Sequence, residues 1–197
     1  MKFSHREIKD LWFAGFMISL AFAVLLAGGY RVLFSFSATG FAFVIAFFTA
    51  GVGFLLHELM HKYVAQNYGL WAEFVAFKGM LWLALLFSFF GFIFAAPGAV
   101  FINGYITKER NGKISLAGPM TNIVLGILFL IFLLVFEKDG LLGYFFNIGL
   151  SINALLGAFN MIPLMPFDGA KVKAWNEGIY WITLIIAAGL FSVSWIF

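Results

Sequence analysis

The sequence predicts an all-α polytopic membrane protein with about five to six transmembrane helices, and two observations support this prediction. The first is composition. Of the 197 residues, 63% are hydrophobic and 11% are charged, whereas a soluble domain carries about 25% charged residues. The second is that charge-free runs long enough to be membrane spans follow one another along the chain. These runs are residues 11–30, 32–56, 79–107, 114–136, 140–167 and 178–197. We expect one integral membrane domain over residues 1–197.

The first charge-free run follows a basic N-terminal segment that contains Lys2, Arg6 and Lys9. Such an arrangement resembles a signal peptide. The run of 20 residues is longer than the usual apolar core of a signal peptide, and no clear small-residue cleavage site follows it. We therefore expect residues 11–30 to be a first span that the protein retains.

The third run is ambiguous, because Pro97 and several glycines interrupt it. The residues after this proline, 99–102 and 104–107, are typical of a strand. The Asn-Gly pair at 111–112 is a strong signal for a tight hairpin turn, with 114–116 as the returning strand. The run is therefore either a full span followed by a loop, or a re-entrant element with a short β-hairpin that leaves on the side where it entered.

The distribution of Lys and Arg distinguishes these alternatives. If the third run makes no net crossing, ten of the twelve cations lie on the N-terminal side, and only Arg31 and Lys138 lie on the other. If it crosses, each side has six. The positive-inside rule favours the first arrangement and a cytoplasmic N-terminus. We therefore expect a multi-pass protein of the cell membrane with five spans and one re-entrant element.

The sequence His57-Glu58-Leu59-Met60-His61 is the clearest functional signal in the chain. Two histidines four residues apart on a helix project from one face, which suits two imidazole ligands of one zinc ion, and the glutamate between them can act on a metal-bound water. A chance match is the alternative. However, the 25 residues before the motif carry no charge, and ionisable groups within a span are costly enough to indicate function.

A catalytic zinc ion normally has three protein ligands, and with no cysteine in the chain the third must be His, Asp or Glu. His5 lies in the charged N-terminal segment. Asp168 is the better candidate, because the two prolines within 160–169 end a helix and turn the carboxylate back into the protein. Asp168 can reach His57 and His61 only if the third run makes no net crossing, which is also what the charge distribution favours.

Three motifs together resemble those of the site-2 proteases, a family of intramembrane zinc metalloproteases. The H-E-x-x-H element lies within residues 53–61, a G-P-x-x-N element matches 118–122, and N-x-x-P-x-x-P-x-D-G matches 160–169 at every fixed position. The resemblance covers about residues 39–173, and archaeal and bacterial members are the most similar. The chain departs from many relatives in a long apolar insertion over 80–97.

The resemblance implies a metal site and a general base. His57, His61 and Asp168 would bind one Zn²⁺, and Glu58 would deprotonate the metal-bound water and then protonate the leaving amine. It also implies the substrate class: single-pass transmembrane proteins, cleaved near the cytoplasmic face of the lipid bilayer in regulated intramembrane proteolysis.

Three asparagines have two interpretations each. Asn160 and Asn122 are candidate catalytic residues that would bind the substrate backbone or the oxyanion, and the alternative for both is hydrogen bonding between helices. For Asn153 packing is the favoured interpretation. The predicted hairpin over 99–116 would offer an unpaired edge to an extended substrate, or it would plug the catalytic cavity.

Other function classes fit less well. A membrane zincin of the prenyl-protein-processing type would need a glutamate ligand, and no downstream glutamate lies in an apolar helix. A non-catalytic metal-binding scaffold of the same fold is the alternative from another class, and the intact Glu58 argues against it. A transporter would show paired repeats, and a nucleic-acid-binding protein would show a basic patch with aromatic residues on a soluble domain. Neither feature is present.

Overall fold

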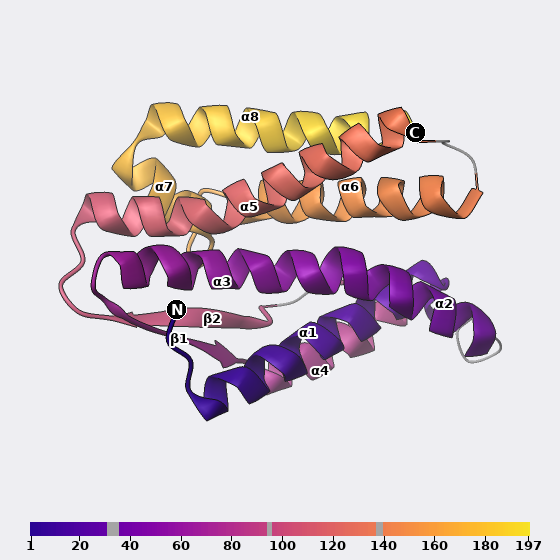
Figure 1. Cartoon of the computed structure of the whole chain (residues 1–197), viewed down its shortest axis with the longest axis horizontal. Helices are drawn as coiled ribbons and strands as arrows, with labels where there is room; N and C mark the ends of the chain where they lie inside the picture. Colours follow the sequence, from indigo (N-terminus) through magenta and orange to yellow (C-terminus); the bar gives the residue numbers. More distant parts are fainter. Residues whose placement is uncertain (31–35, 94–95, 137–139) are drawn as a thin grey trace. The chain divides into compact units, whose positions relative to one another are not determined.

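The computed structural model describes residues 1–30, 36–93, 96–136 and 140–197 (Figure 1). It is mostly helical, as predicted, with one two-stranded antiparallel sheet. The chain forms two compact units: residues 1–55 with 73–101, and residues 56–72 with 102–197. The expected single domain stays a prediction. Two cations of the charge distribution, Arg31 and Lys138, lie outside the described residues.

The first unit is built around helix α1, His5–Leu26. The Ser4 side chain accepts a hydrogen bond from the Glu7 amide and caps the start of this helix. Helix α2 (Phe36–Ala46) continues through a π-helical turn (Phe47–Gly51) into α3, Val52–Asn67. Helix α1 packs against α2, the π-helical turn and α4.

The sheet pairs strand β1, Trp71–Ala76, with strand β2, Gly98–Asn103. Between them lies the short helix α4, Lys78–Ser88. Its 11 residues extend about 16 Å, well short of a hydrocarbon core of about 30 Å. The Phe77 amide donates a hydrogen bond to the Pro97 carbonyl at 3.0 Å. The chain therefore returns from this segment to the point where it left the sheet.

The prediction of a β-hairpin with its turn at 111–112 is wrong. Residues 99–102 are in a strand as predicted, but their partner is β1, and 104–107 lie outside any strand. Helix α5 begins at Lys108 and ends at Val135, so the Asn-Gly pair and residues 114–116 are helical. The Thr107 side chain caps this helix by accepting from the Arg110 amide at 3.2 Å. This cap, together with tertiary packing, outweighs the local turn signal.

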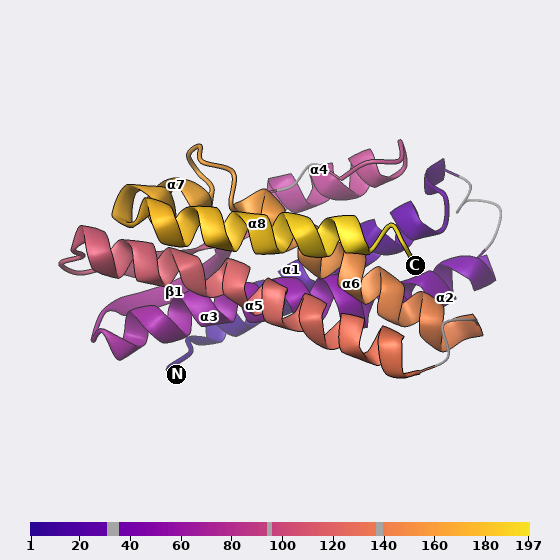
Figure 2. The ribbon, with the colours of Figure 1, turned by 90° about the horizontal axis from the view of Figure 1, so that it is seen from above.

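The second unit is a helical bundle. Helices α5, α6 (Gly140–Asn160) and α8 (Glu177–Val193) lie side by side, and the short α7 (Asp168–Trp175) packs against α5 and α8 (Figures 1 and 2). Ile123, Leu150 and Leu190 bring one buried residue from each long helix into a shared core. This bundle carries Asp168 and the residues that surround the histidine motif.

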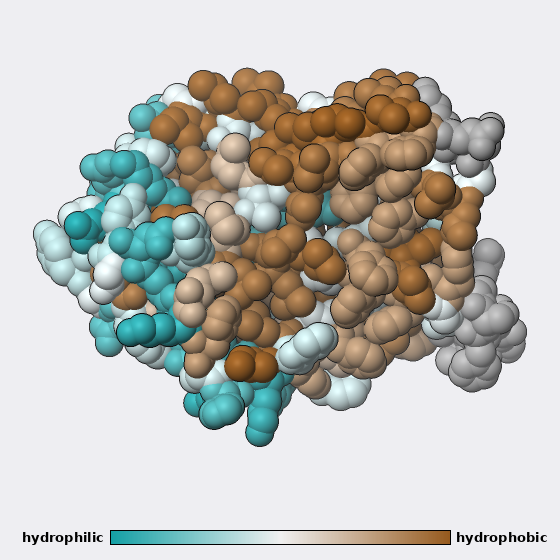
Figure 3. Space-filling model, viewed as in Figure 1, coloured by the Kyte–Doolittle hydropathy of each residue, from teal (hydrophilic) through white to brown (hydrophobic). Residues whose placement is uncertain are grey.

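Within the described residues, four helices are long and apolar enough to cross a membrane: His5–Leu26, Thr39–Asn67, Lys108–Val135 and Gly140–Asn160. They correspond to four of the expected spans, and α8 is apolar but shorter, with 17 residues. In the second unit, hydrophobic side chains cover α8 and the later part of α5, whereas hydrophilic ones gather near the start of α5 (Figure 3). This distribution is typical of a helical bundle whose apolar part faces lipid.

Candidate metal centre

Helix α3 places the two histidines of the motif on one face, one turn apart. Their Nε2 atoms lie 3.0 Å from each other, and the rings meet edge to face. Both side chains are buried, with exposed fractions of 4% for His57 and 7% for His61. Two imidazoles that direct the same nitrogen toward one point can supply two of the four ligands of a tetrahedral metal ion.

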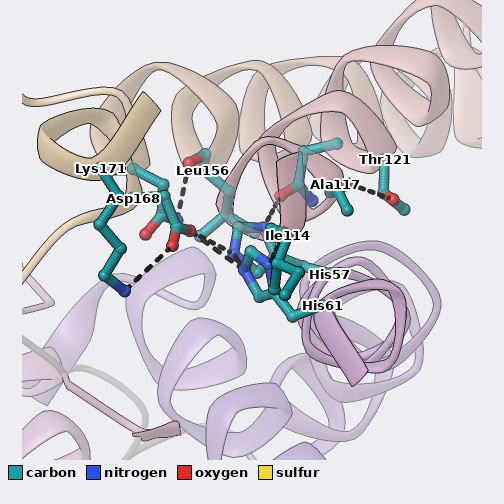
Figure 4. Close-up of polar contacts among 10 residues, drawn as sticks. His57, His61, Ile114, Ala117, Thr121, Leu156, Asp168 and Lys171 are labelled. Carbon is teal, nitrogen blue, oxygen red and sulfur yellow. Dashed lines mark hydrogen bonds and ion pairs between the residues drawn. The ribbon is translucent and has the colours of Figure 1, made fainter. Parts of the chain in front are cut away.

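The third predicted ligand reaches the same point. Helix α6 ends at Asn160, and Asp168 begins α7 after a short irregular connection. The Asp168 Oδ2 atom lies 3.4 Å from the His57 Nε2 and 3.1 Å from the His61 Nε2 (Figure 4). The structure thus brings together the three ligands proposed from the sequence, although they come from segments more than a hundred residues apart.

Two neighbouring residues hold the Asp168 carboxylate in place. Gly169 packs directly on the backbone of Met161, where a Cβ atom would lie 2.7 Å from the Met161 Cα. The Lys171 Nζ lies 3.8 Å from the other carboxylate oxygen, Oδ1 (Figure 4).

Helix α5 orients both imidazole rings through their other nitrogen. The His61 Nδ1 lies 2.7 Å from the Ile114 carbonyl, and the His57 Nδ1 lies 2.6 Å from the Asn122 Oδ1. An oxygen of either kind only accepts, so each Nδ1 carries the proton and donates it. Each Nε2 then keeps its lone pair for a metal, as in the outer-shell contacts of metal-bound histidines.

Gly118 lies midway between Ile114 and Asn122 on the same face of α5. A Cβ atom at this position would lie 2.5 Å from the His57 Nε2 and would also overlap the Nε2 of His61. The missing side chain keeps open the space into which both nitrogens point. The Gly118 backbone is in an ordinary helix. Glycine is therefore needed here for the close approach of the two rings and not for its conformational freedom.

The three residues fit a zinc ion. On a tetrahedral zinc with bonds of about 2.0–2.1 Å, neighbouring ligand atoms lie about 3.3 Å apart. The three pairs of ligand atoms are separated by 3.0, 3.1 and 3.4 Å. Two imidazole nitrogens and one carboxylate oxygen are also a typical catalytic donor set, which leaves one position open.

Comparison with known proteins agrees with this geometry. The chain is 41% identical over 198 residues, 98% of both chains, to a Methanocaldococcus jannaschii protein whose name gives zinc metalloprotease as a provisional function. The chain belongs to this zinc metalloprotease family. A second M. jannaschii zinc metalloprotease is 33% identical over 129 residues, which are 65% of the present chain and 33% of that relative.

A third relative comes from Bacillus subtilis, and its name also gives zinc metalloprotease as a provisional function. It is 30% identical over 142 residues, 61% of the present chain and 64% of the relative. No family model matches the chain, and no solved structure matches it.

The candidate catalytic residues lie in different settings. Glu58 is buried next to His57 in α3. Asn160, the last residue of α6, donates through Nδ2 to the Leu156 carbonyl of its own helix at 3.0 Å. Asn122 is fully buried and bonded to His57. The catalytic roles of Glu58, Asn160 and Asn122 stay predictions.

Several residues around the metal centre were missed by sequence reasoning. They are Ile114, Gly118, Gly169 and Lys171, which lie against the three ligands or beside them in the chain. A signal existed for two of them, since Gly118 and Gly169 are fixed positions of the matched motifs. Asn153 was interpreted from the sequence as a packing residue. The Ile114 contact uses a backbone carbonyl, which leaves no trace in the identity of the residue.

Proposed function

We propose that the protein is an intramembrane zinc endopeptidase of the site-2 protease type, which hydrolyses peptide bonds of single-pass transmembrane proteins near the cytoplasmic face. The observation that carries the proposal is the convergence of His57, His61 and Asp168, with the two histidines inside a helix apolar enough to span a membrane. A metalloprotease with two of its three ligands in such a helix is suited to substrates that are themselves in the membrane.

Each residue of the site has a role in this reaction. When bound, zinc supplies Lewis acidity toward the scissile carbonyl and toward a water molecule. His57, His61 and Asp168 would hold it. Glu58 accepts a proton from the attacking water as the new C–O bond forms, and it passes that proton to the leaving amine as the C–N bond breaks. Asn160, at the end of α6, is the candidate for binding the oxyanion or the substrate backbone.

The proposed topology has a re-entrant segment over 78–97 and a cytoplasmic N-terminus. Two features of the first unit support the re-entrant segment: α4 is too short to cross a membrane, and the Phe77–Pro97 hydrogen bond brings the chain back to its starting point. With no net crossing here, ten of twelve cations lie on the cytoplasmic side.

The sheet offers a way to hold an unwound substrate. A transmembrane helix resists hydrolysis because its amides are already hydrogen-bonded, so the substrate must become extended near the metal. Glu7 of α1 accepts from the Phe74 amide at 2.9 Å, and Asp10 accepts from the Ala76 amide at 3.2 Å. These carboxylates occupy the outer edge of β1, which directs any added strand to the outer edge of β2.

Purified, reconstituted protein tests the proposed function. We expect about one zinc per chain by elemental analysis, together with cleavage of a single-pass substrate. The Glu58→Gln variant should keep the zinc and lose cleavage, and Asp168→Ala should lose zinc.

Three results would contradict the proposal. Full zinc in the Asp168→Ala variant would remove Asp168 from the site. Zinc binding without any cleavage by the wild type would favour the metal-binding scaffold. Cleavage of prenylated soluble peptides, with transmembrane substrates left intact, would favour the prenyl-protein type of zincin.

A further inference from the structure

Asn153 of α6 is a fully buried amide, one helix removed from the histidine motif. We propose that Asn153 is a positioning residue of the metal centre, which acts through Asn122 to fix the tautomer and orientation of His57. The inference rests on the metal centre of the proposed function, but it concerns a residue outside the three ligands of that site.

Three hydrogen bonds connect the backbone of α6 to the His57 ring. The Asn153 Nδ2 donates to the Gly149 carbonyl at 2.9 Å. The Asn122 Nδ2 donates to the Asn153 Oδ1 at 3.1 Å. The His57 Nδ1 lies 2.6 Å from the Asn122 Oδ1. Asn122 and Asn153 are fully buried, so both amides depend on protein partners.

The Gly149 carbonyl fixes which group donates and which accepts in each of these three hydrogen bonds. A backbone carbonyl only accepts, so Asn153 must turn its NH₂ group toward Gly149 and its oxygen toward Asn122. Asn122 must then present its own NH₂ group to Asn153, which leaves its oxygen for His57. The His57 Nδ1 must donate, and its Nε2 therefore remains unprotonated and directed at the ligand position.

His61 provides an internal comparison. Its Nδ1 bonds directly to the Ile114 carbonyl, a backbone group whose polarity no side chain can change. A substitution at Asn153 should therefore alter the tautomer and orientation of the His57 ring and leave those of His61 unchanged. Simple helix packing by Asn153 makes a different prediction, because a packing defect lowers stability without selecting one histidine.

The test uses the full-length protein in detergent micelles and three variants at this position. Asn153→Leu removes the hydrogen bonds to the Gly149 carbonyl and to Asn122. Asn153→Thr keeps a hydroxyl for the carbonyl four residues earlier, a bond that Thr121 and Thr183 already make in their own helices, but its side chain is too short to replace the Asn153 oxygen that faces Asn122. Asn153→Asp keeps a side-chain oxygen at the same place that can accept from the Asn122 amide, so it serves as the rescue variant.

Asn147→Leu is the matched control. Asn147 lies on the same helix, six residues earlier, and its carboxamide oxygen accepts from the Ser151 hydroxyl within α6 at 3.2 Å. This substitution also removes an asparagine hydrogen bond from α6, but it leaves the Gly149–Asn153–Asn122 connection unchanged.

Two readouts besides proteolysis decide the matter. Competition with a chelator gives zinc affinity, and ¹⁵N chemical shifts of the imidazole nitrogens in the zinc-free protein give the tautomer of each histidine. We expect the Leu and Thr variants to bind zinc about 10–100-fold more weakly and to show a mixed tautomer at His57 only. The Asp variant and the Asn147→Leu control should match the wild type.

Each outcome has a distinct meaning. Wild-type zinc affinity and an unchanged His57 tautomer in the Thr variant would overturn the inference, even if the Leu variant failed to fold. Equal changes at both histidines would also overturn it, in favour of general packing. Failure of the wild type to bind zinc would instead contradict the proposed function and not the link between Asn153 and His57, which the tautomer in the zinc-free protein still tests.

Discussion

A Cβ atom on Gly118 would lie 2.5 Å from the Nε2 of His57, so the metal centre depends on a missing side chain in α5. This close approach explains why the helix opposite the histidine motif has a glycine in its interior, where alanine is ordinarily favoured by about 0.5–1 kcal/mol.

The Gly118→Ala substitution should therefore abolish zinc binding and activity while leaving the chain folded. The matched control is Gly126→Ala, two turns further along α5, where the nearest atoms to a new Cβ are 3.7 Å away. We expect the control to keep wild-type zinc content by elemental analysis. Wild-type zinc content in Gly118→Ala would show that the two Nε2 atoms do not share a metal at this place.

Gly169→Ala should weaken zinc binding by moving the third ligand. A Cβ here would lie 2.7 Å from the Met161 Cα, so α7 must shift away from the end of α6 and take Asp168 with it. We expect a loss of about 1–3 kcal/mol in stability from this overpacking, together with reduced zinc affinity in chelator competition. Gly189→Ala, with open space around the new atom, should change neither quantity. An unchanged zinc affinity in Gly169→Ala would contradict this prediction, because the Asp168 carboxylate would then keep its place although α7 had shifted.

Removal of zinc should lower the thermal unfolding temperature of the wild type. A ligand that binds only the folded state adds about 2.7 kcal/mol when its free concentration is one hundred times its dissociation constant. We expect zinc to raise the midpoint again in wild type and in Glu58→Gln, but not in Asp168→Ala. The comparison is made by fluorescence-monitored melting in detergent with chelator or with added zinc. A similar rise in Asp168→Ala would place the stabilising ion elsewhere.

Proline substitutions can test whether β2 receives the substrate. In the antiparallel register set by the Phe77–Pro97 bond, the amides of Val100 and Ile102 face away from β1. Val100→Pro and Ile102→Pro remove these outward donors, and we expect slower cleavage of a helical transmembrane substrate with zinc content unchanged. Phe101→Pro removes an inward amide and should mainly weaken the sheet. Undiminished cleavage by the two outer-edge variants would exclude substrate addition at β2.

The sequence carried enough information for the ligands because helical periodicity and topology are both simple rules. His57 and His61 were predicted from their spacing on one helix. Asp168 was predicted from the prolines that end another helix, on the side of the membrane that the distribution of Lys and Arg favours. β1 was not predictable in this way, since its partner follows only after the inserted helix α4. The Asn-Gly pair predicted a turn from two residues, whereas the start of α5 depends on the Thr107 cap.

The surroundings of the metal centre were harder to predict for a physical reason. The Ile114 contact comes from the backbone, and the role of Gly118 depends on which helix lies opposite. The link from Asn153 to Asn122 requires knowing that α5 and α6 meet at those two side chains. Each of these depends on contacts between helices, which the pattern of a single helix does not encode.

The hydrogen bond between Phe77 and Pro97 makes the segment between them a modular insert. Because its two ends meet, it can lengthen, shorten or be exchanged for a tight turn without moving β1 or β2, and loop-closure entropy changes only slowly with its length. Variation among related proteins should therefore concentrate in this segment. A chimaera that replaces this segment with a short turn would keep the sheet. Its activity would show whether catalysis depends on the apolar segment.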